Sequence, residues 1–188
     1  MECGICVVIV GVVAGGKTTI IKRLIETMPG AAMMRTYTTR APREGEREGG
    51  DRIFVSREEF MSMVDSGDIF ERNEFSGSLY GSSKKVLDGL LAENRVVFVN
   101  VNVDGAMLYQ RHVPDAVTIF IDAPDEHIIR RIKLRGSMSD KDMAWRLTEA
   151  DRERSLKHQF DSQIENPDGN LEKSIARVRE IVESRLGR

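Results

Sequence analysis

The 188-residue chain has no long hydrophobic run, no excess of either charge and few cysteines. Its first apolar stretch, Ile5–Val13, is too short to span a bilayer, and no other stretch approaches the roughly 18 apolar residues that a membrane helix needs. The formal net charge of −2 gives no reason to expect general binding of nucleic acid or of a membrane surface. The N-terminus has no cationic leader, and we therefore expect a cytoplasmic protein.

The two cysteines, Cys3 and Cys6, form an isolated C-x-x-C pair. Such a pair can act in redox chemistry or supply half of a zinc site. A zinc site needs four ligands, no second pair exists, and the histidines His112, His127 and His158 are scattered. A redox pair normally opens a helix, whereas these cysteines lead into a predicted strand. We therefore expect both to be inert strand residues, with the two functional roles as alternatives.

Apolar runs alternate with helical patterns along most of the chain, and there is no repeat or low-complexity segment. Runs without polar alternation are typical of parallel strands buried on both faces. The sequence therefore predicts an α/β fold, a parallel sheet flanked by helices. The predicted strands are Ile5–Val10, Arg95–Val101, Val117–Asp122 and Asp161–Ile164; the predicted helices are Lys17–Met28, Ser83–Glu93, Asp125–Arg135, a long helix ending near His158, and Leu171–Leu186.

The segment from residue 36 to residue 82 interrupts this alternation. It begins with a loop rich in glycine, proline and arginine, followed by a short strand at Ile53–Val55 and a capping box that opens a short helix after Ser56. Two strand-like pieces follow, Ile69–Phe75 and Ser78–Tyr80. We expect a small β-rich insertion that projects from the core and holds a second substrate.

Residues Gly11–Thr18, GVVAGGKT, match G-x-x-x-x-G-K-[ST] at every fixed position, between a predicted strand and a predicted helix. Glycine lets backbone amides converge on a phosphate, and the following helix offers its positive end to the same group. The fixed positions match by chance in about one chain of this size in a hundred, so an ordinary strand–helix turn is the weaker interpretation. The predicted ATP-binding residues here are Gly11, Ala14, Gly15, Gly16, Lys17, Thr18 and Thr19, with Thr18 as the ligand of Mg²⁺.

From this loop onward the chain resembles guanylate kinases over nearly its full length. Thr38–Ser56, TTRAPREGEREGGDRIFVS, resembles the T-T-R-x-P-R-x-G-E…G-x-D-Y-x-F-V-S signature of that family. Ser76–Ser82, SGSLYGS, resembles its G-N-Y-Y-G segment. Arg131–Gly136, together with Arg146 and Leu147, resembles the family's lid and the helices beside it.

The resemblance implies a P-loop NTPase-type parallel sheet flanked by helices, with a small β-rich insertion that binds a nucleoside monophosphate and a helical lid. It divides a single domain, 1–188, into a core (1–35, 83–135 and 147–188), a GMP-binding insertion (36–82) and a lid (136–146). The implied activity is the Mg²⁺-dependent, in-line transfer of a phosphoryl group from ATP to GMP, and to dGMP. The implied partners are these small nucleotides, with no nucleic acid and no membrane, in a monomer or small homo-oligomer.

The resemblance also implies how GMP is held. Two arginines and a tyrosine hydroxyl are good donors to a terminal phosphate. A carboxylate accepts the paired N–H groups of guanine, a contact that adenine cannot make. A solvated charged loop is the alternative for the arginines, and an exposed or ion-paired carboxylate is the alternative for Glu71. The implied GMP-binding residues are Arg40, Arg43 and Tyr80 for the phosphate, and Glu71, Ser82, Thr36 and Asn102 on the guanine side.

Phosphoryl transfer depends on alignment, charge neutralisation and exclusion of water. By resemblance, Lys17 and the lid residues Arg131, Arg135 and Arg146 supply these functions. The four-residue spacing of Arg131 and Arg135 puts both on one helical face; the alternative is that they are solvated helix charges. The region of Asn166 resembles the adenine-contacting loop of the family.

The chain departs from the family pattern at several polar positions. Arg52 occupies the position of a phosphate-binding tyrosine, where it could serve as a cationic donor or point outward. Asn100 and Asn102 replace acidic residues, and Asp104 or Asp122 could restore a carboxylate near the metal. We expect these changes to affect the rate and the acceptor rather than the fold.

Two other functions remain open from the sequence. A related kinase for another phosphorylated acceptor, such as a ribose bisphosphate, shares the asparagine after the central strand and the ending at Asp168–Leu171. A catalytically silent guanylate-kinase-like module that binds a protein partner typically loses the lysine of the phosphate loop, which is present here as Lys17. Glu71 and the complete signature favour GMP.

Overall fold

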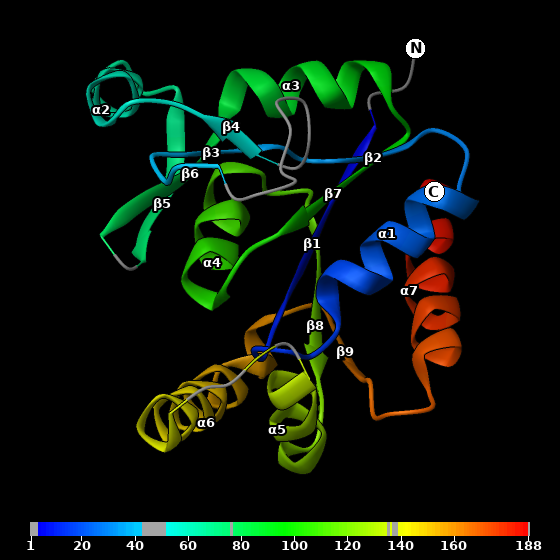
Figure 1. The fold of residues 1–188 in the computed structure, drawn as a ribbon. Coiled ribbons are helices and arrows are strands. Elements are labelled where there is room, and N and C mark those ends of the chain that lie inside the picture. The colour runs from blue at the N-terminus through cyan, green and yellow to red at the C-terminus, as the bar shows by residue number, and fades with distance from the viewer. Residues whose placement is uncertain (1–3, 43–51, 76, 135, 137–138, 188) are drawn as a thin grey trace.

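The computed structural model describes residues 4–42, 52–75, 77–134, 136 and 139–187. Within these residues the chain forms two sheets (Figure 1). The main sheet has five parallel strands in the order β2-β7-β1-β8-β9, and the second sheet has four strands in the order β4-β3-β6-β5. The predicted parallel sheet flanked by helices is confirmed.

Strands and helices alternate along the main sheet. Its strands are β1 (Ile5–Gly11), β2 (Ala31–Met33), β7 (Val96–Asn100), β8 (Val117–Asp122) and β9 (Ser162–Glu165). The helices that follow or cover them are α1 (Lys17–Thr27), α3 (Lys84–Glu93), α4 (Val103–His112), α5 (Asp125–Leu134), α6 (Asp140–Ser155), the short 3₁₀ helix Lys157–Gln159, and α7 (Leu171–Leu186).

The central strand β1 is buried on both faces, and its side chains alternate between two cores. Val7 and Ile9 pack with the apolar faces of α1 and α7. Val8 and Val10 pack on the opposite face, in a cluster to which α3, α4, α5 and α6 contribute. The continuous apolar run of the sequence is therefore explained by helices on both sides of the sheet.

The second sheet is built from β3 (Thr36–Thr38), β4 (Arg52–Phe54), β5 (Ile69–Phe75) and β6 (Ser78–Ser83). Its apolar face packs on α2 (Arg57–Asp65) through Phe60, Ile69 and Leu79. The predicted capping box of α2 is confirmed, because the Ser56 hydroxyl accepts from the Glu59 amide and the Glu59 carboxylate accepts from the Ser56 amide. The other face carries the polar side chains of Thr36, Arg52, Glu71 and Tyr80, and Phe70 packs there against Tyr109 of α4.

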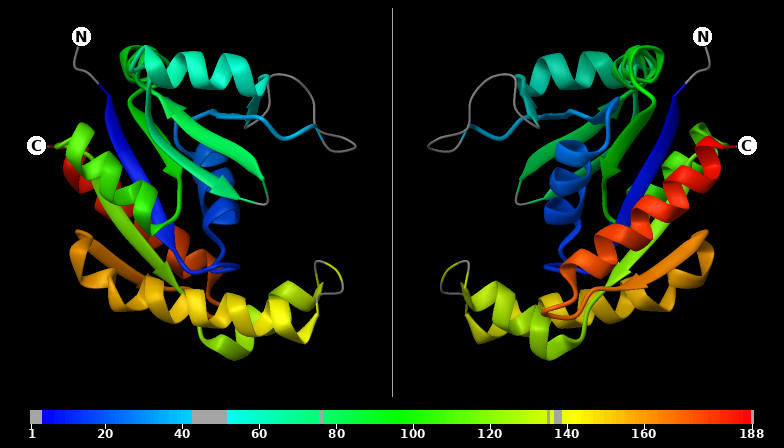
Figure 2. Two further views of the ribbon diagram at one scale, coloured as in Figure 1. Left: turned by 90° about the vertical axis from the view of Figure 1, so that its left-hand side faces the viewer. Right: turned by 90° about the vertical axis from the view of Figure 1, so that its right-hand side faces the viewer.

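The second sheet and α6 extend on the same side of the main sheet, as two arms separated by the carboxyl ends of β1 and β7 (Figure 2). Ligands of open parallel sheets bind at the carboxyl ends of the strands. The fold therefore brings the loop after β1, the polar face of the second sheet and one side of α6 around a common space.

The sequence prediction missed two strands, β2 and β3. Both contain three residues, and β2 lies at the edge of the main sheet with half-buried side chains, so neither produces a hydrophobic period. The segment before residue 52 was expected to begin as a loop, but β3 is the inner strand that pairs with both β4 and β6. Smaller corrections concern boundaries: β4 is Arg52–Phe54 rather than Ile53–Val55, β6 runs on to Ser83, and β9 begins at Ser162.

Cys6 is buried in β1, and burial raises the pKa of its thiol to about 12. A thiol in that state is a poor nucleophile and a poor metal ligand, which supports the inert assignment; Cys3 lies outside the described residues. None of the helices in the described ranges is long and apolar enough to cross a bilayer.

A substitution at Gly11 tests the packing of the junction between β1 and the loop that follows. Its φ is +132°, and a Cβ there would lie 2.0 Å from the Ile121 carbonyl oxygen of β8. Gly11→Ala should therefore lower the free energy of unfolding by about 3 kcal/mol, since strain and overlap add. Gly89→Ala, in an exposed turn of α3 with open space around it, should raise it by about 0.5–1 kcal/mol. Urea denaturation measures both, and equal effects would contradict the assignment.

Candidate active site

The loop between β1 and α1 has the backbone of an anion-binding turn. Gly16 caps α1 with a φ of +99°, and Ala14 is a non-glycine residue with positive φ, 55°. A Cβ on Gly16 would lie 2.4 Å from the Asn166 side-chain nitrogen, so glycine is needed there for space as well as for conformation. The start of α1 directs its unpaired amides and its positive dipole end toward the same region.

Side chains hydrogen-bond the carbonyl groups of this loop. The Lys17 ammonium donates to the carbonyl oxygens of Gly11 (2.6 Å) and Val12 (2.9 Å). The Asn166 amide donates to the Gly15 carbonyl oxygen (2.8 Å), and Arg131 donates to that of Ala14 (3.0 Å). The loop is thus fixed in an amide-presenting form by three side chains, two of them distant in sequence.

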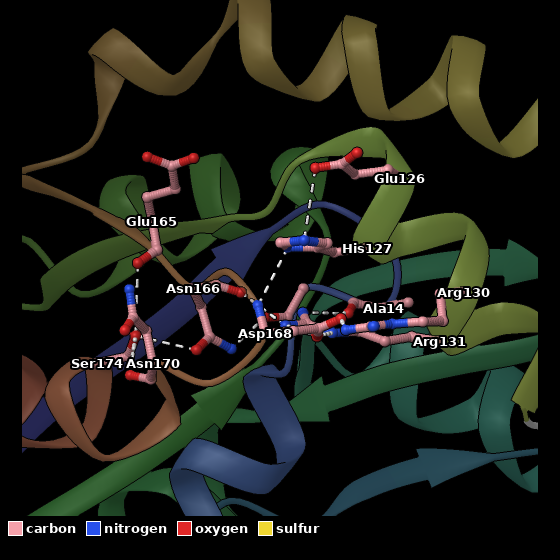
Figure 3. Close-up of polar contacts among 11 residues, drawn as sticks. Ala14, Glu126, His127, Arg130, Arg131, Glu165, Asn166, Asp168, Asn170 and Ser174 are labelled. Carbon is pink, nitrogen blue, oxygen red and sulfur yellow. Dashed lines mark hydrogen bonds and ion pairs between the residues drawn. The ribbon is translucent and has the colours of Figure 1, made fainter.

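Arg131 lies on α5 beside the phosphate loop, and the catalytic role expected for it stays a prediction. Its guanidinium also donates to the Asp168 carboxylate (2.8 Å) and to the Asn166 carbonyl oxygen (2.7 Å), which joins the phosphate loop to the segment before α7 (Figure 3). Arg130 pairs with the same carboxylate. Asn166 is buried, and its side-chain oxygen accepts from the Ser174 hydroxyl (3.0 Å). The nitrogen and the oxygen of the Asn166 side-chain amide therefore both form hydrogen bonds within the protein.

A smaller cavity of about 340 Å³ lies beside this network. It is lined by Ala14, Gly16 and Thr19 from the loop and α1, by Arg131, and by Asn166–Gly169. Its position behind the phosphate loop suits the nucleoside part of the nucleotide whose phosphates the loop would hold. The adenine-contacting role expected for Asn166 stays a prediction; in this structure its side chain is buried and hydrogen-bonded to Gly15 and Ser174.

Thr18 and Asn100 lie where a metal bound to the nucleotide would be expected. The Asn100 amide at the end of β7 donates to the Thr18 hydroxyl (3.0 Å), which leaves the second lone pair of that oxygen for a cation. Asn102 caps α4, where its side-chain oxygen accepts from the Gly105 amide (2.9 Å). Among the described residues no group of three or more acidic, histidine or cysteine side chains could hold a metal. This donor set fits Mg²⁺, which commonly uses few protein ligands and completes its shell with phosphates and water.

Asp104 and Asp122 do not supply the missing carboxylate. Arg152 of α6 pairs with Asp104 (2.9 Å), and Arg154 of α6 pairs with Asp122 (2.9 Å). Arg154 also donates to the Ala123 carbonyl oxygen. These contacts attach α6 to the carboxyl ends of the main sheet, so both aspartates serve to place that helix.

The main cavity, about 560 Å³, opens between the phosphate loop, the second sheet and α6. Its size is in the usual range for a small-molecule site. One end contains Gly11 and Lys17, and the other contains Thr36, Glu71 and Tyr80 from the second sheet. The structure therefore brings predicted donor and acceptor residues around one space. The remaining lining residues include Arg52, Asn73, Asn100, Asn102, Trp145, Arg146, Glu149 and Glu153.

Strand register explains why the acceptor side is polar. Glu71 of β5 lies opposite Ser82 of β6, and Asn73 lies opposite Tyr80. Tyr80 in turn lies opposite Thr38 of β3. From Glu71 onward, residues two apart on a strand share a face, and a register shift between Ile69 and Glu71 lets Ile69 pack on α2 while Glu71 borders the cavity. Polar side chains from three strands therefore meet on the face that borders the cavity.

Glu71 is the buried carboxyl of the cavity, 2% exposed. Burial raises its pKa, while a hydrogen bond from the Ser82 hydroxyl (2.8 Å) and the positive charge of Arg52 oppose that rise. Its other oxygen lies close to the first turn of α4, since a Cβ on Gly105 would be 2.9 Å away. An exposed strand carboxylate is therefore excluded for Glu71, and so is a directly ion-paired one among the salt bridges of the described residues.

The predicted phosphate-binding residues are placed only in part. Tyr80 lines the cavity. Arg40 lies past the end of β3, with its guanidinium 5.5 Å from the centre of the Phe54 ring and a hydrogen bond to the Ala41 carbonyl oxygen. Arg43 and the lid residue Arg135 lie outside the described residues, so their convergence on a phosphate stays a prediction. Arg146 lines the cavity from α6, and the lid role expected for it stays a prediction.

Sequence reasoning missed three side chains on the same side of α6. Trp145, Glu149 and Glu153 line the cavity, and the spacing of Arg146, Glu149 and Glu153 by three and four residues puts them on one helical face. This spacing was available in the sequence, but without the fold nothing indicated that this face points toward the phosphate loop.

Comparisons with known proteins agree with this geometry. The family model for guanylate kinase matches residues 4–185. A guanylate kinase of Idiomarina loihiensis is 38% identical over 89% of this chain and 80% of its own length. That of Rubrobacter xylanophilus is 36% identical over 97% of both chains. The crystal structure of a guanylate kinase from Anaplasma phagocytophilum superposes with a TM-score of 0.77 at 27% identity, over all of this chain and 88% of its own.

A shikimate kinase from Bacteroides thetaiotaomicron, 14% identical with a TM-score of 0.50 over 95% of this chain and 98% of its own, shares the fold alone. The family model matches nearly the whole chain. In addition, a relative above 30% identity aligns with this chain over almost the full length of both. The chain therefore belongs to the guanylate kinase family.

Proposed function

We propose that this protein transfers the γ-phosphoryl group of ATP to GMP or dGMP, giving ADP and the nucleoside diphosphate. The observation that carries the proposal is that one cavity joins Lys17 of the phosphate loop to the buried carboxyl of Glu71. The curated relatives named guanylate kinase support the same reaction. An anion site and a guanine-reading carboxylate at opposite ends of one space are what a two-nucleotide reaction requires.

The transfer is a direct displacement. An oxygen of the GMP phosphate attacks the γ-phosphorus, and the bond from that phosphorus to the β,γ-bridging oxygen of ATP breaks in line, so that ADP leaves. Lys17 exchanges its two loop carbonyls for phosphate oxygens, a stronger charge-assisted contact. Thr18 would hold Mg²⁺ together with the nucleotide phosphates, and the ion would supply positive charge next to the transferred group. Arg146 adds positive charge from α6.

Guanine recognition requires Glu71 in its ionised form. An ionised carboxylate accepts two hydrogen bonds in parallel, which matches the N1–H and the exocyclic amine of guanine. Adenine presents an unprotonated N1 on the same edge, so a buried carboxylate would lose its partner there. The same carboxylate repels an anionic sugar bisphosphate, which disfavours the ribose bisphosphate alternative. The intact Lys17 disfavours a silent module.

We further propose that residues 36–82 form the part that binds the monophosphate and that residues 136–146 form a lid. Four strands and α2 lie in or next to the first segment and make a separate sheet. The second segment includes the start of α6, whose exposed Trp145 lines the cavity. If the segment 136–146 closed over the cavity, it would exclude water from the transfer.

Lys17→Ala tests the donor site. The variant should lose phosphoryl transfer from ATP to GMP by about 100-fold or more in kcat/KM, because a positioned charge at the transferred group is removed. A coupled assay of ADP formation measures this loss. Lys22→Ala, an exposed lysine on the same helix, is the matched control and should keep nearly full activity. A Lys17→Ala variant with near-normal turnover would exclude this site.

Glu71→Gln tests the acceptor site. Glutamine offers one acceptor oxygen and adds a donor, so one guanine hydrogen bond is lost and a donor is left facing a donor. We expect the KM for GMP to rise by about 10- to 100-fold while the KM for ATP changes little. Glu58→Gln, an exposed carboxylate on α2, should change neither. An equal loss for both nucleotides would contradict a base-reading role.

Glu153 places a second buried carboxyl in the cavity. Burial raises its pKa to about 7, together with the nearby acidic groups of Glu149 and Asp104, while Lys17 and Arg152 act in the opposite direction. A carboxyl that is partly protonated near neutral pH repels nucleotide phosphates less than a fully ionised one does. The side chain can therefore stand near Lys17 without excluding the anion that Lys17 must bind.

The raised pKa of Glu153 predicts a pH-dependent stability. Because the folded pKa of about 7 lies above the ordinary value of 4.5, the ionised folded form is disfavoured, and stability is lost as pH rises between these values. Glu153→Gln removes this loss. The variant should be more stable than the parent above about pH 7, by roughly 1–3 kcal/mol, and the difference should vanish near pH 4.5. Thermal unfolding across this range measures it; Glu26→Gln, an exposed carboxylate on α1, should show no such trend.

A further inference from the structure

Arg52 occupies a central place on the acceptor side of the cavity. It is half-buried and lines the cavity with Glu71 and Tyr80. The parallel register of β3 and β4 puts Arg52 directly opposite Thr36, so both side chains lie on the face that borders the cavity. The next residue, Ile53, lies opposite Tyr37, which packs with the α2 cluster, so Ile53 is on the other face of the sheet.

The guanidinium contacts two other residues that the acceptor site uses. It donates a hydrogen bond to the Thr36 hydroxyl. It also lies over the ring of Tyr80, 5.5 Å from the ring centre, which is cation–π geometry. One rigid, planar group therefore connects the side chains of β3 and β6, and arginine suits this place because its fork combines directed donors with a stacking plane.

Arg52 is also the charged group that acts on Glu71. Three elements face this carboxyl: β6 with the Ser82 hydroxyl, α4 with Tyr109, and β4 with Arg52. Burial raises the pKa of Tyr109 well above its ordinary value, so this phenol is a neutral neighbour. The positive charge of Arg52 lowers the pKa of Glu71 and so opposes the effect of burial.

We propose that Arg52 is a positioning and specificity residue of the GMP site: it orients Thr36 and Tyr80 and places a positive charge on the wall of the cavity that holds the base-reading Glu71. The inference rests on the proposed function, because it assigns a further residue to the acceptor end of the same cavity. Arg52 lies near Glu71, which would read the base, and over the ring of Tyr80, which would bind the phosphate. One cation would therefore act on the base and on the phosphate of GMP.

Two variants of Arg52 separate the effect of its positive charge from the effect of its planar shape. Arg52→Gln removes the charge and the planar fork, so the KM for GMP should rise by about tenfold or more while the KM for ATP stays within about twofold. Arg52→Lys restores the charge but not the fork. It should recover the pH behaviour described next and only part of the affinity.

The pH profile separates an electrostatic role from a structural one. Without the positive charge, Glu71 takes up its proton more readily, so the acidic limb of kcat/KM for GMP should move to higher pH in Arg52→Gln and return in Arg52→Lys. The GMP phosphate also titrates in this range, but it does so equally with every variant and cancels in the ratio to the parent. In the double variant Glu71→Gln/Arg52→Gln the additional shift should disappear.

GMP binding is measured separately through Trp145, the single tryptophan of the chain, which lines the cavity. A fluorescence titration with GMP alone, on the parent and on Arg52→Gln, needs no turnover. No binding of GMP to the parent would sink the proposed function. Binding that is equal in parent and variant, with the same acidic limb, would overturn the role of Arg52 and leave the function standing. An equal loss of ATP and GMP affinity with a lowered melting temperature would reduce Arg52 to a structural residue.

Discussion

The donor site depends on the direction of the peptide groups between β1 and α1. A trans peptide points the N–H of one residue away from the carbonyl of the residue before it. Because Lys17 hydrogen-bonds the Val12 carbonyl and Asn166 hydrogen-bonds the Gly15 carbonyl, the amides that follow these carbonyls face the other way. The loop is therefore set to receive an anion before any nucleotide arrives, and little ordering has to accompany binding. Arg131 extends this arrangement to the segment before α7.

Asn166 and Lys17 both hold the loop, but they differ in whether they keep these contacts once a nucleotide is bound. Asn166 is buried and engaged at both ends of its amide, so it can remain in place while phosphate binds. Lys17 contacts carbonyl dipoles that are weaker partners than phosphate oxygens, so it can exchange them. Asn100 illustrates how a neutral residue can replace an acidic one: its amide orients the Thr18 hydroxyl instead of adding charge. The phosphates then supply the negative charge that a cation needs.

The sequence predicted four of the five strands of the main sheet and the phosphate loop, because these are coded locally, whereas the short edge strand β2 and helix α4 were missed. A continuous apolar run specifies a strand such as β1, and eight consecutive residues specify the loop. The acceptor side was harder, because the neighbours of Glu71 come from β4, β6 and α4 and depend on register. A three-residue segment such as Thr36–Thr38 is too short to show a hydrophobic period, so its place as an inner strand could not be predicted. For the same reason Arg52 could be assigned a direction only once β3 and β4 were paired.

This division between local and register-dependent coding has a functional consequence. The donor is held largely by main-chain groups, which every residue carries, so substitutions between the fixed glycines can be tolerated as long as the turn survives. The acceptor end of the cavity is lined by side chains that meet across strands, so a single replacement there changes the chemistry of the wall. A replacement of Arg52 on β4 would therefore change its contacts with Thr36 and Tyr80 while the contacts that fix the phosphate loop stay as they are. Variation in substrate preference within such a fold should accordingly concentrate on the polar face of the second sheet, because that face can change without disturbing the loop that binds ATP.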